Sequence, residues 1–335
     1  MLAQQNSWDA LRLMAALMVL VSHQHALLGG VQPTVLGWNT LGGLGVSVFF
    51  FLSGALIWQS WQRDPAPTRF LRRRALRIFP GLWVVLLSST FLLGAWVTEQ
   101  RLSVYLSDAE TWRYLSGAFL VIRHHLPGVF ETNPYPSAVN GSLWTLPVEF
   151  GCYLMAMGVG LGVRRWGSQL VWGAWLVAVI LAAWGPALAG TRFTSHFEMI
   201  AVFWWGVVSA ETLFGAAKLS SRCLLLIAAV LVCNAVFGGD RGMARSGIVG
   251  LAAGLVVVFY LWRSGADLTR KMGDWSYGVY VYAFPVQQLW VHLGQGRGWG
   301  FGQYLLLSVL TTLALAGLSW HWVEKPALRF KPVVT

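Results

Sequence analysis

Two ionisable residues, Arg12 and His23, lie in one apolar stretch near the start of the sequence. Titratable side chains inside a bilayer are costly unless they face a partner or a wet cavity, so they mark a functional site. Eleven helical steps separate the two residues, about 1100° of rotation, so their side chains share one face roughly 16 Å apart. His25 points to the other side, and we expect a structural role for it. Asp9, one turn before Arg12, is expected to hold that guanidinium in place.

A third ionisable residue, Glu149, lies in the apolar stretch 143–163. Glu149 and His23 are each six residues from the predicted outer end of their stretch, which is a depth of about 9 Å. We therefore expect the two side chains to meet. A carboxylate beside an imidazole orients it and raises its basicity, as in a general base. The alternative is a structural pairing of Glu149 with another donor.

Four arginines, Arg72, Arg73, Arg74 and Arg77, lie in the run RFLRRRALRIFP. Arg74 and Arg77 are about one helical turn apart and share a face. Guanidinium groups bind phosphate oxygens in a bidentate manner, so this run is a candidate phosphate site. The alternative is a cytoplasmic topology signal without further function.

The composition indicates a membrane protein. The chain has 335 residues, of which 56% are hydrophobic and only 11% are charged, against about 25% charged in soluble domains. Ten apolar stretches are long enough to cross about 30 Å of hydrocarbon: 8–29, 42–61, 75–98, 143–163, 170–190, 194–214, 222–238, 245–263, 273–294 and 301–323. These predict an all-α bundle of about ten transmembrane helices forming a single domain over residues 1–335. Residues 99–142 are predicted to be a long outer loop that contacts the acceptor or covers the outer face.

The positive charge follows the predicted topology. If the N-terminus is cytoplasmic, 16 of the 24 Lys and Arg residues lie on the cytoplasmic side and 7 on the other. This asymmetry satisfies the positive-inside rule, so we expect both termini to be cytoplasmic. The net charge of +11 therefore reflects the bilayer and not nucleic acid. The expected location is the cell membrane, which is the inner membrane in a Gram-negative source. Neither cysteine nor histidine spacing predicts a metal site.

Several ordered motifs resemble those of the acyltransferase 3 family, membrane enzymes that O-acylate surface polysaccharides and related glycans. They are Arg12 with His23 after ten intervening residues, GVSVFFFLSG, RRALRIFP, SLWTLPVE, SYGVY and VEKP, and they cover almost the whole chain. The resemblance implies transfer of an acyl group, acetyl in the commonest case, from cytoplasmic acyl-CoA to a glycan hydroxyl. The sequence departs from the family at Ser47, where many members are acidic, and at Ala283, where many have histidine.

The resemblance assigns roles to particular residues. His23, Arg12 and Glu149 are the expected catalytic residues, with His23 as general base or transient acyl carrier. Arg12 would stabilise charge on the thioester carbonyl or on a phosphate.

The remaining assignments concern substrates. Acyl-CoA is the expected donor, with no permanently bound cofactor, and the acceptor is a surface or lipid-linked glycan. Arg72, Arg73, Arg74 and Arg77 are expected to bind the donor, and Ser53, Trp144 and Tyr277 are expected to contact substrate. The alternative function is a transporter or flippase that moves a lipid-linked sugar or acyl donor without chemistry. The oligomeric state does not follow from the sequence.

Overall fold

Apolar stretches of the sequence form long helices in the computed structural model, which describes residues 8–35, 39–214 and 273–332. Six described helical segments are long and apolar enough to cross a membrane: Trp8–Leu27, Leu41–Arg63, Pro67–Val97, Gly141–Trp166, Gln169–Ala189 and Phe301–Leu328. The protein is therefore a helical, multi-pass membrane protein. Within the described part, the all-α prediction holds apart from a short antiparallel pairing of β1 (Thr34–Val35) with β2 (Asn39–Thr40).

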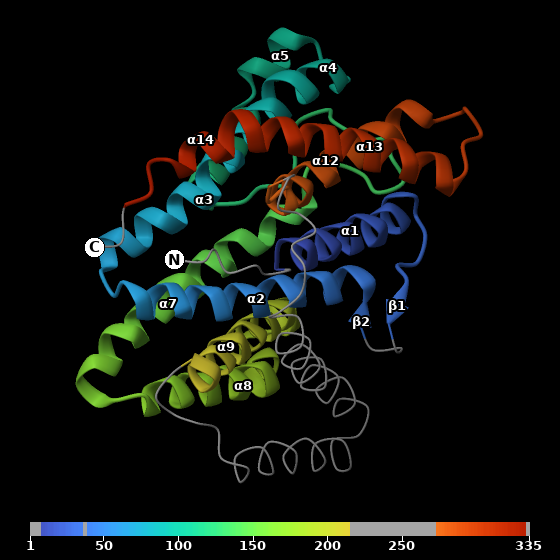
Figure 1. The fold of residues 1–335 in the computed structure, drawn as a ribbon. Helices are drawn as coiled ribbons and strands as arrows, with labels where there is room; N and C mark the ends of the chain where they lie inside the picture. The colour runs from blue at the N-terminus through green and yellow to red at the C-terminus, as the bar shows by residue number, and fades with distance from the viewer. Residues whose placement is uncertain (1–7, 36–38, 215–272, 333–335) are drawn as a thin grey trace.

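Helices occupy eight of the ten predicted positions (Figure 1). The long helices are α1 (Trp8–Leu27), α2 (Leu41–Arg63), α3 (Pro67–Ser88), α7 (Thr145–Trp166), α8 (Gln169–Ala189), α9 (Thr194–Phe214), α12 (Ser276–Gly294) and α13 (Phe301–Ser319). The π-helical turn η1 (Ser89–Gly94) and α4 (Ala95–Val97) extend α3, and the π-helical turn η5 (Trp320–Glu324) and α14 (Lys325–Leu328) extend α13. The predicted spans 222–238 and 245–263 lie outside the described residues, so the total of ten stays a prediction.

The third span begins earlier than predicted. The helix starts at Pro67 instead of residue 75, so the basic run forms its first turns. Proline is favoured at a first helical position, because its missing N–H has no partner there in any helix. Asp64, just before this helix, pairs with Arg69 and Arg73. This pairing explains why a helix can begin with so many positive charges.

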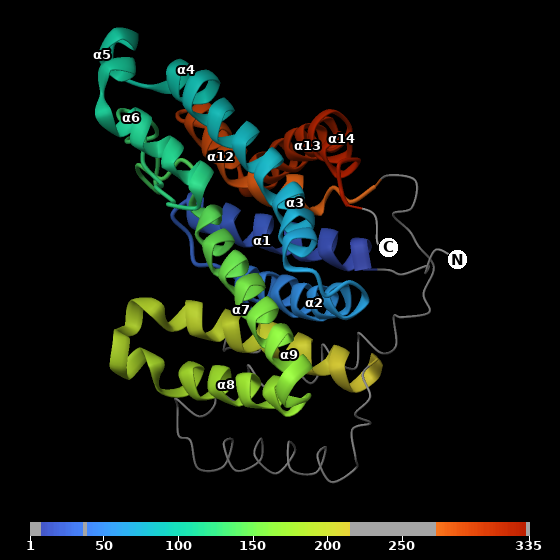
Figure 2. The same cartoon turned by 90° about the vertical axis from the view of Figure 1, so that its left-hand side faces the viewer.

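The predicted outer loop contains short helices and then folds back into the bundle. Its helices are α5 (Leu102–Ser107), α6 (Ala109–Tyr114) and η2 (Leu115–Phe119), beside α4 at one end of the molecule (Figure 2). Asn140 is fully buried, and its Nδ2 donates at 2.8 Å to the carbonyl of Val281, which lies within α12. The 3₁₀ turn η3 (Gly141–Trp144) and α7 therefore begin inside the bundle and not at its surface.

Helix α2 packs between α1 and α9 (Figure 1). Glycines make the α2–α9 contact close: a Cβ at Gly54 would overlap the Phe203 carbonyl oxygen, and one at Gly206 would overlap the Phe51 carbonyl oxygen. Small residues of this kind allow membrane helices to approach closely, so that van der Waals contacts between backbones hold them together.

Replacing Gly206 with alanine should destabilise the protein, because the new methyl group would push α9 away from α2. Such overpacking costs about 1–3 kcal/mol, and it should appear as a lower melting temperature of the purified protein in detergent. Gly158→Ala is the matched control, since a Cβ there meets nothing within 4 Å. Equal melting temperatures for the two variants would contradict the close α2–α9 packing.

Candidate active site

A cavity of about 440 Å³ lies between α1, α2, α3, α7 and α12. Ser60, Arg63, Leu328 and Lys331 line one end, close to where α2 and α14 finish. Val46, Phe49, Thr145 and Tyr280 line the other end, where the Phe49 and Tyr280 rings are 5.6 Å apart. The cavity therefore runs along α2 from the end of that helix toward the middle of the bundle.

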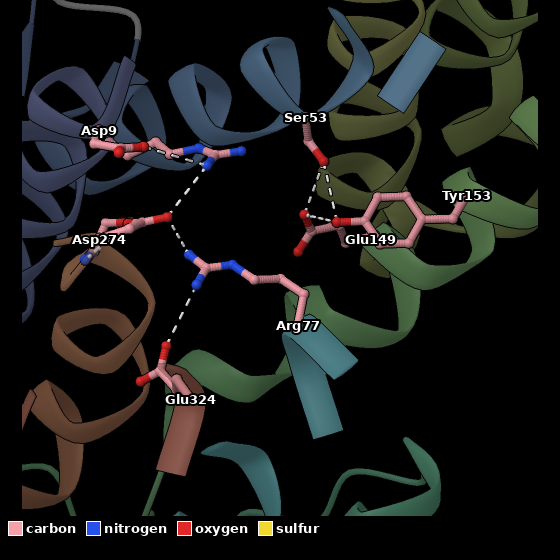
Figure 3. A network of polar contacts seen from close by, with 9 residues as sticks. Asp9, Ser53, Arg77, Glu149, Tyr153, Asp274 and Glu324 are labelled. Carbon is pink, nitrogen blue, oxygen red and sulfur yellow. Dashed lines mark hydrogen bonds and ion pairs between the residues drawn. The ribbon is translucent and has the colours of Figure 1, made fainter. Parts of the chain in front are cut away.

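Asp274 is the centre of an ion-pair network in this cavity (Figure 3). Its carboxylate pairs with Arg12 at 3.4 Å and with Arg77. Arg77 also contacts Glu324 at 3.5 Å, and Arg12 lies 3.9 Å from Asp9, as predicted. The network connects α1, α3, the start of α12 and the end of η5.

Sequence reasoning missed Asp274 and Glu324. Asp274 lies two residues before SYGVY, and its Oδ1 accepts a hydrogen bond from the Ser276 amide at 3.3 Å, at the start of α12. Glu324 is the acidic residue of VEKP and the last residue of the π-helical turn η5. It is 2% exposed. Both residues are acidic and lie within or beside an apolar stretch, and this feature could have marked them as functional-site candidates in the sequence.

Glu149 forms a second polar group with Ser53 and Tyr153 (Figure 3). Ser53 Oγ donates to Glu149 Oε1 at 2.9 Å, and Tyr153 Oη donates to the same oxygen at 2.5 Å. The expected contact with His23 is not among the hydrogen bonds of the described residues. The depth estimate for Glu149 assumed that its helix starts at the membrane surface, whereas α7 starts inside the bundle.

His23 lies apart from the cavity, toward the opposite end of α1. It is half-buried, and its ring centroid lies 5.3 Å from that of Phe284. Within the described part of the chain, Nδ1 of His23 has no hydrogen-bond partner. Tyr135 stacks against the same phenylalanine at 6.3 Å and is 46% exposed. His25 packs instead on Phe301, with ring centroids 4.2 Å apart, so the two histidines do point in different directions.

The four predicted donor-binding arginines have different surroundings. Arg72 is exposed and does not line the cavity. Arg73 lines the cavity but is nearly buried, and its Nη1 bonds Asp64 at 2.6 Å. Arg74 lines the cavity and donates to Ser60 Oγ at 3.3 Å, while Arg77 belongs to the Asp274 network. Arg69 and Arg73 hold the pKa of the Asp64 carboxyl well below its usual range by hydrogen bonding, so Asp64 stays charged and keeps Arg73 occupied.

Two of the three predicted substrate contacts line the cavity. Ser53 does so from α2, and Tyr277 does so from α12, where its hydroxyl donates to the Ile78 carbonyl at 2.7 Å. Trp144 lies outside the cavity, with its ring 5.0 Å from that of His196. Its neighbour Thr145 lines the cavity instead.

Replacing Asp274 with asparagine should lower the melting temperature, because Arg12 and Arg77 would lose the carboxylate that they share. Removing one partner of a buried ion pair costs about 3–5 kcal/mol. Glu110→Gln is the control, since its pair with Arg113 is exposed, and such pairs contribute about 0–1 kcal/mol. An Asp274→Asn protein as stable as the Glu110→Gln protein would show that the network does not hold the helices together.

Comparison with known proteins identifies the family. Residues 5–320 match the acyltransferase domain family. The chain is 31% identical over 332 residues to an O-acetyl transferase of Shigella phage Sf6, covering 96% of each protein. It is 25% identical to the exopolysaccharide production protein ExoZ of Rhizobium meliloti, covering 87% of this chain and 90% of that one.

A third relative is longer than this chain. The peptidoglycan O-acetyltransferase OatA of Listeria monocytogenes is 24% identical, and the match covers 96% of this chain but 55% of that protein. No solved structure matches the chain. With its match over residues 5–320 and the buried polar residues of its ordered motifs, the chain belongs to the acyltransferase 3 family of membrane enzymes.

Proposed function

We propose that this protein transfers an acyl group, acetyl in the simplest case, from acyl-CoA to a hydroxyl of a surface or lipid-linked glycan. The observation that carries the proposal is the placement of Arg12 and His23 on one helix. Arg12 lines the polar cavity, and His23 lies eleven residues further along α1, about 16 Å away. A donor in the cavity and an acceptor at His23 would meet along this helix.

Measured along α12, the inner end of the cavity is close to the residue that contacts His23. Tyr280 lines the inner end of the cavity, and Phe284, four residues later, contacts His23. Four helical steps are about 6 Å. A pantetheine arm is long and uncharged between its thioester and its phosphate, so it could extend through the cavity toward this aromatic layer.

In the proposed reaction the acceptor hydroxyl attacks the thioester carbonyl carbon. His23 takes the hydroxyl proton as the C–O bond forms, and the proton then goes to the thiolate as the C–S bond breaks. Its Nδ1 has no hydrogen-bond partner within the described residues, and a neutral imidazole can accept a proton. Arg12, held by Asp274 and Asp9, would stabilise negative charge on the donor. Glu149 would shape the cavity with Ser53 and Tyr153.

Exposed Tyr135 is a candidate contact for the acceptor, since its ring contacts Phe284, the same residue that His23 contacts. Its backbone is fixed, because Gln288 Nε2 donates to the Tyr135 carbonyl at 2.9 Å. The names of two relatives, an exopolysaccharide production protein and a peptidoglycan O-acetyltransferase, support a glycan acceptor. Cytoplasmic termini would put the donor cavity on the cytoplasmic side and His23 toward the outside. The host membrane would be the cell membrane.

His23→Ala should abolish transfer of labelled acetyl groups from acetyl-CoA to glycan, because general base catalysis contributes about 10²–10⁴-fold. The measurement uses purified protein in vesicles, with the melting temperature as a check on folding. His25→Ala is the matched control and should retain activity. Normal transfer by the His23→Ala protein would exclude His23 as the base.

The same vesicles separate transfer from transport. Membership of an acyltransferase family favours covalent label on the glycan. Label that crosses the vesicle wall without joining sugar would instead support a transporter.

A further inference from the structure

The charges around the cavity are not balanced. Six basic side chains line it, those of Arg12, Arg63, Arg73, Arg74, Arg77 and Lys331, but only two acidic ones do, those of Glu149 and Asp274. Asp274 pairs with Arg12 and Arg77, and Asp64, behind the cavity wall, pairs with Arg73. Arg63, Arg74 and Lys331 have no carboxylate partner among the residues that the structure describes.

These three cations come from separate segments and meet at the mouth of the cavity. Arg63 is the last residue of α2 and donates a hydrogen bond to Gln59 Oε1 at 3.3 Å. Lys331 follows α14 and is exposed. Arg74 lies deeper, on α3, where it donates to Ser60 and its Nε is buried without a hydrogen-bond partner in the described residues. Like charges gathered in this way repel each other, so an anion with several charges would be bound favourably.

We propose that Arg63, Arg74 and Lys331 bind the phosphate groups of the donor, with Arg74 at the diphosphate and the other two at the ribose phosphate. The assignment rests on the proposed function, in which the acyl end points inward, toward Arg12 and Ser53. The diphosphate then lies nearer the deep Arg74, and the ribose phosphate at the far end of the nucleotide lies at the mouth. Contacts between these cations and the phosphate oxygens would be charge-assisted hydrogen bonds.

This assignment differs from the one based on the arginine run alone. Arg72, Arg73 and Arg77 belong to that run, yet the first is exposed away from the cavity and the other two are occupied by carboxylates. Of the four arginines first assigned to the donor, only Arg74 remains in the new assignment. Arg63 and Lys331 lie outside the run and are brought to it by the fold.

Binding of CoA and of dephospho-CoA, which lacks the ribose phosphate, tests the assignment by calorimetry on the purified full chain. The wild-type protein should bind CoA about tenfold more tightly than dephospho-CoA, because hydrogen bonds to the charged ribose phosphate contribute to binding. Arg63→Gln and Lys331→Gln should each lose much of this preference while binding dephospho-CoA normally. Arg74→Gln should weaken both ligands alike.

Two exposed arginines that do not line the cavity provide controls of equal charge change: Arg329→Gln and Arg164→Gln should bind both ligands like the wild type. Melting temperatures identify any variant that fails to fold. If the Arg74→Gln protein does not fold, Arg74→Lys is measured in its place. Wild-type binding that does not distinguish the two ligands, or Lys331→Gln and Arg63→Gln proteins that keep the full preference, would overturn the assignment. The binding measurement needs no acceptor, so it tests the phosphate assignment alone. If the proposed function is wrong, CoA would still bind but the glycan would stay unlabelled.

The pH dependence gives a second test of Lys331. Partial desolvation at the cavity mouth lowers the pKa of Lys331 to about 8, although part of its surface is exposed. The nearby charges of Arg74, Arg77 and Arg12 act in the same direction, and Asp274 opposes them. The lysine is therefore cationic below that pH and neutral above it, while the arginines and the phosphates keep their charges. The preference for CoA should fall as the pH rises from 7 to 9. It should stay constant in Lys331→Arg, and an equal fall in that variant would exclude Lys331 as the titrating group.

Discussion

The structure around the site depends on one largely buried carboxylate shared by two arginines. Asp274 holds Arg12 of α1 and Arg77 of α3, and Arg77 in turn reaches Glu324 at the end of η5. Without these partners, each charge would have to leave the low-dielectric interior or remain there at a cost of several kcal/mol. The requirement for neutralisation therefore fixes how four helical segments lie around the cavity. A buried ion pair of this kind favours one arrangement of helices more than it adds net stability.

The same pairing determines which cations are available to a ligand. In a polar cavity with low-dielectric walls, a guanidinium that already pairs with two carboxylates attracts a phosphate less than one whose described hydrogen-bond partner is a serine hydroxyl. Arg77 is the first case and Arg74 the second. Position in a basic run is therefore a poor guide to function. The acidic residues that fold against the run decide which members remain free.

Local regularities of the sequence predicted much of this architecture. Helical periodicity correctly placed Arg12 beside Asp9 and separated His23 from His25, because those contacts depend only on helix geometry. Asp274 and Glu324 could not be placed in this way, since they meet Arg12 and Arg77 across 262 and 247 residues of chain. The depth of Glu149 was misjudged for a related reason. Hydropathy marks where an apolar helix runs, but it does not show that the preceding chain enters the bundle and starts that helix from within.

The re-entry of residues 120–140 has a consequence for electrical insulation. The polar cavity ends at Tyr280, and the contact of Phe284 with His23 begins one turn later. Between the cavity and His23, α12 contributes about one helical turn with aromatic side chains, roughly 6 Å, which is far less than the roughly 30 Å of hydrocarbon around the protein. Much of a transmembrane voltage would fall across this layer. An uncharged acyl chain can cross such a layer at little cost, whereas an ion loses its hydration there. If the donor arm passes these rings as proposed, the same rings would preserve the membrane potential.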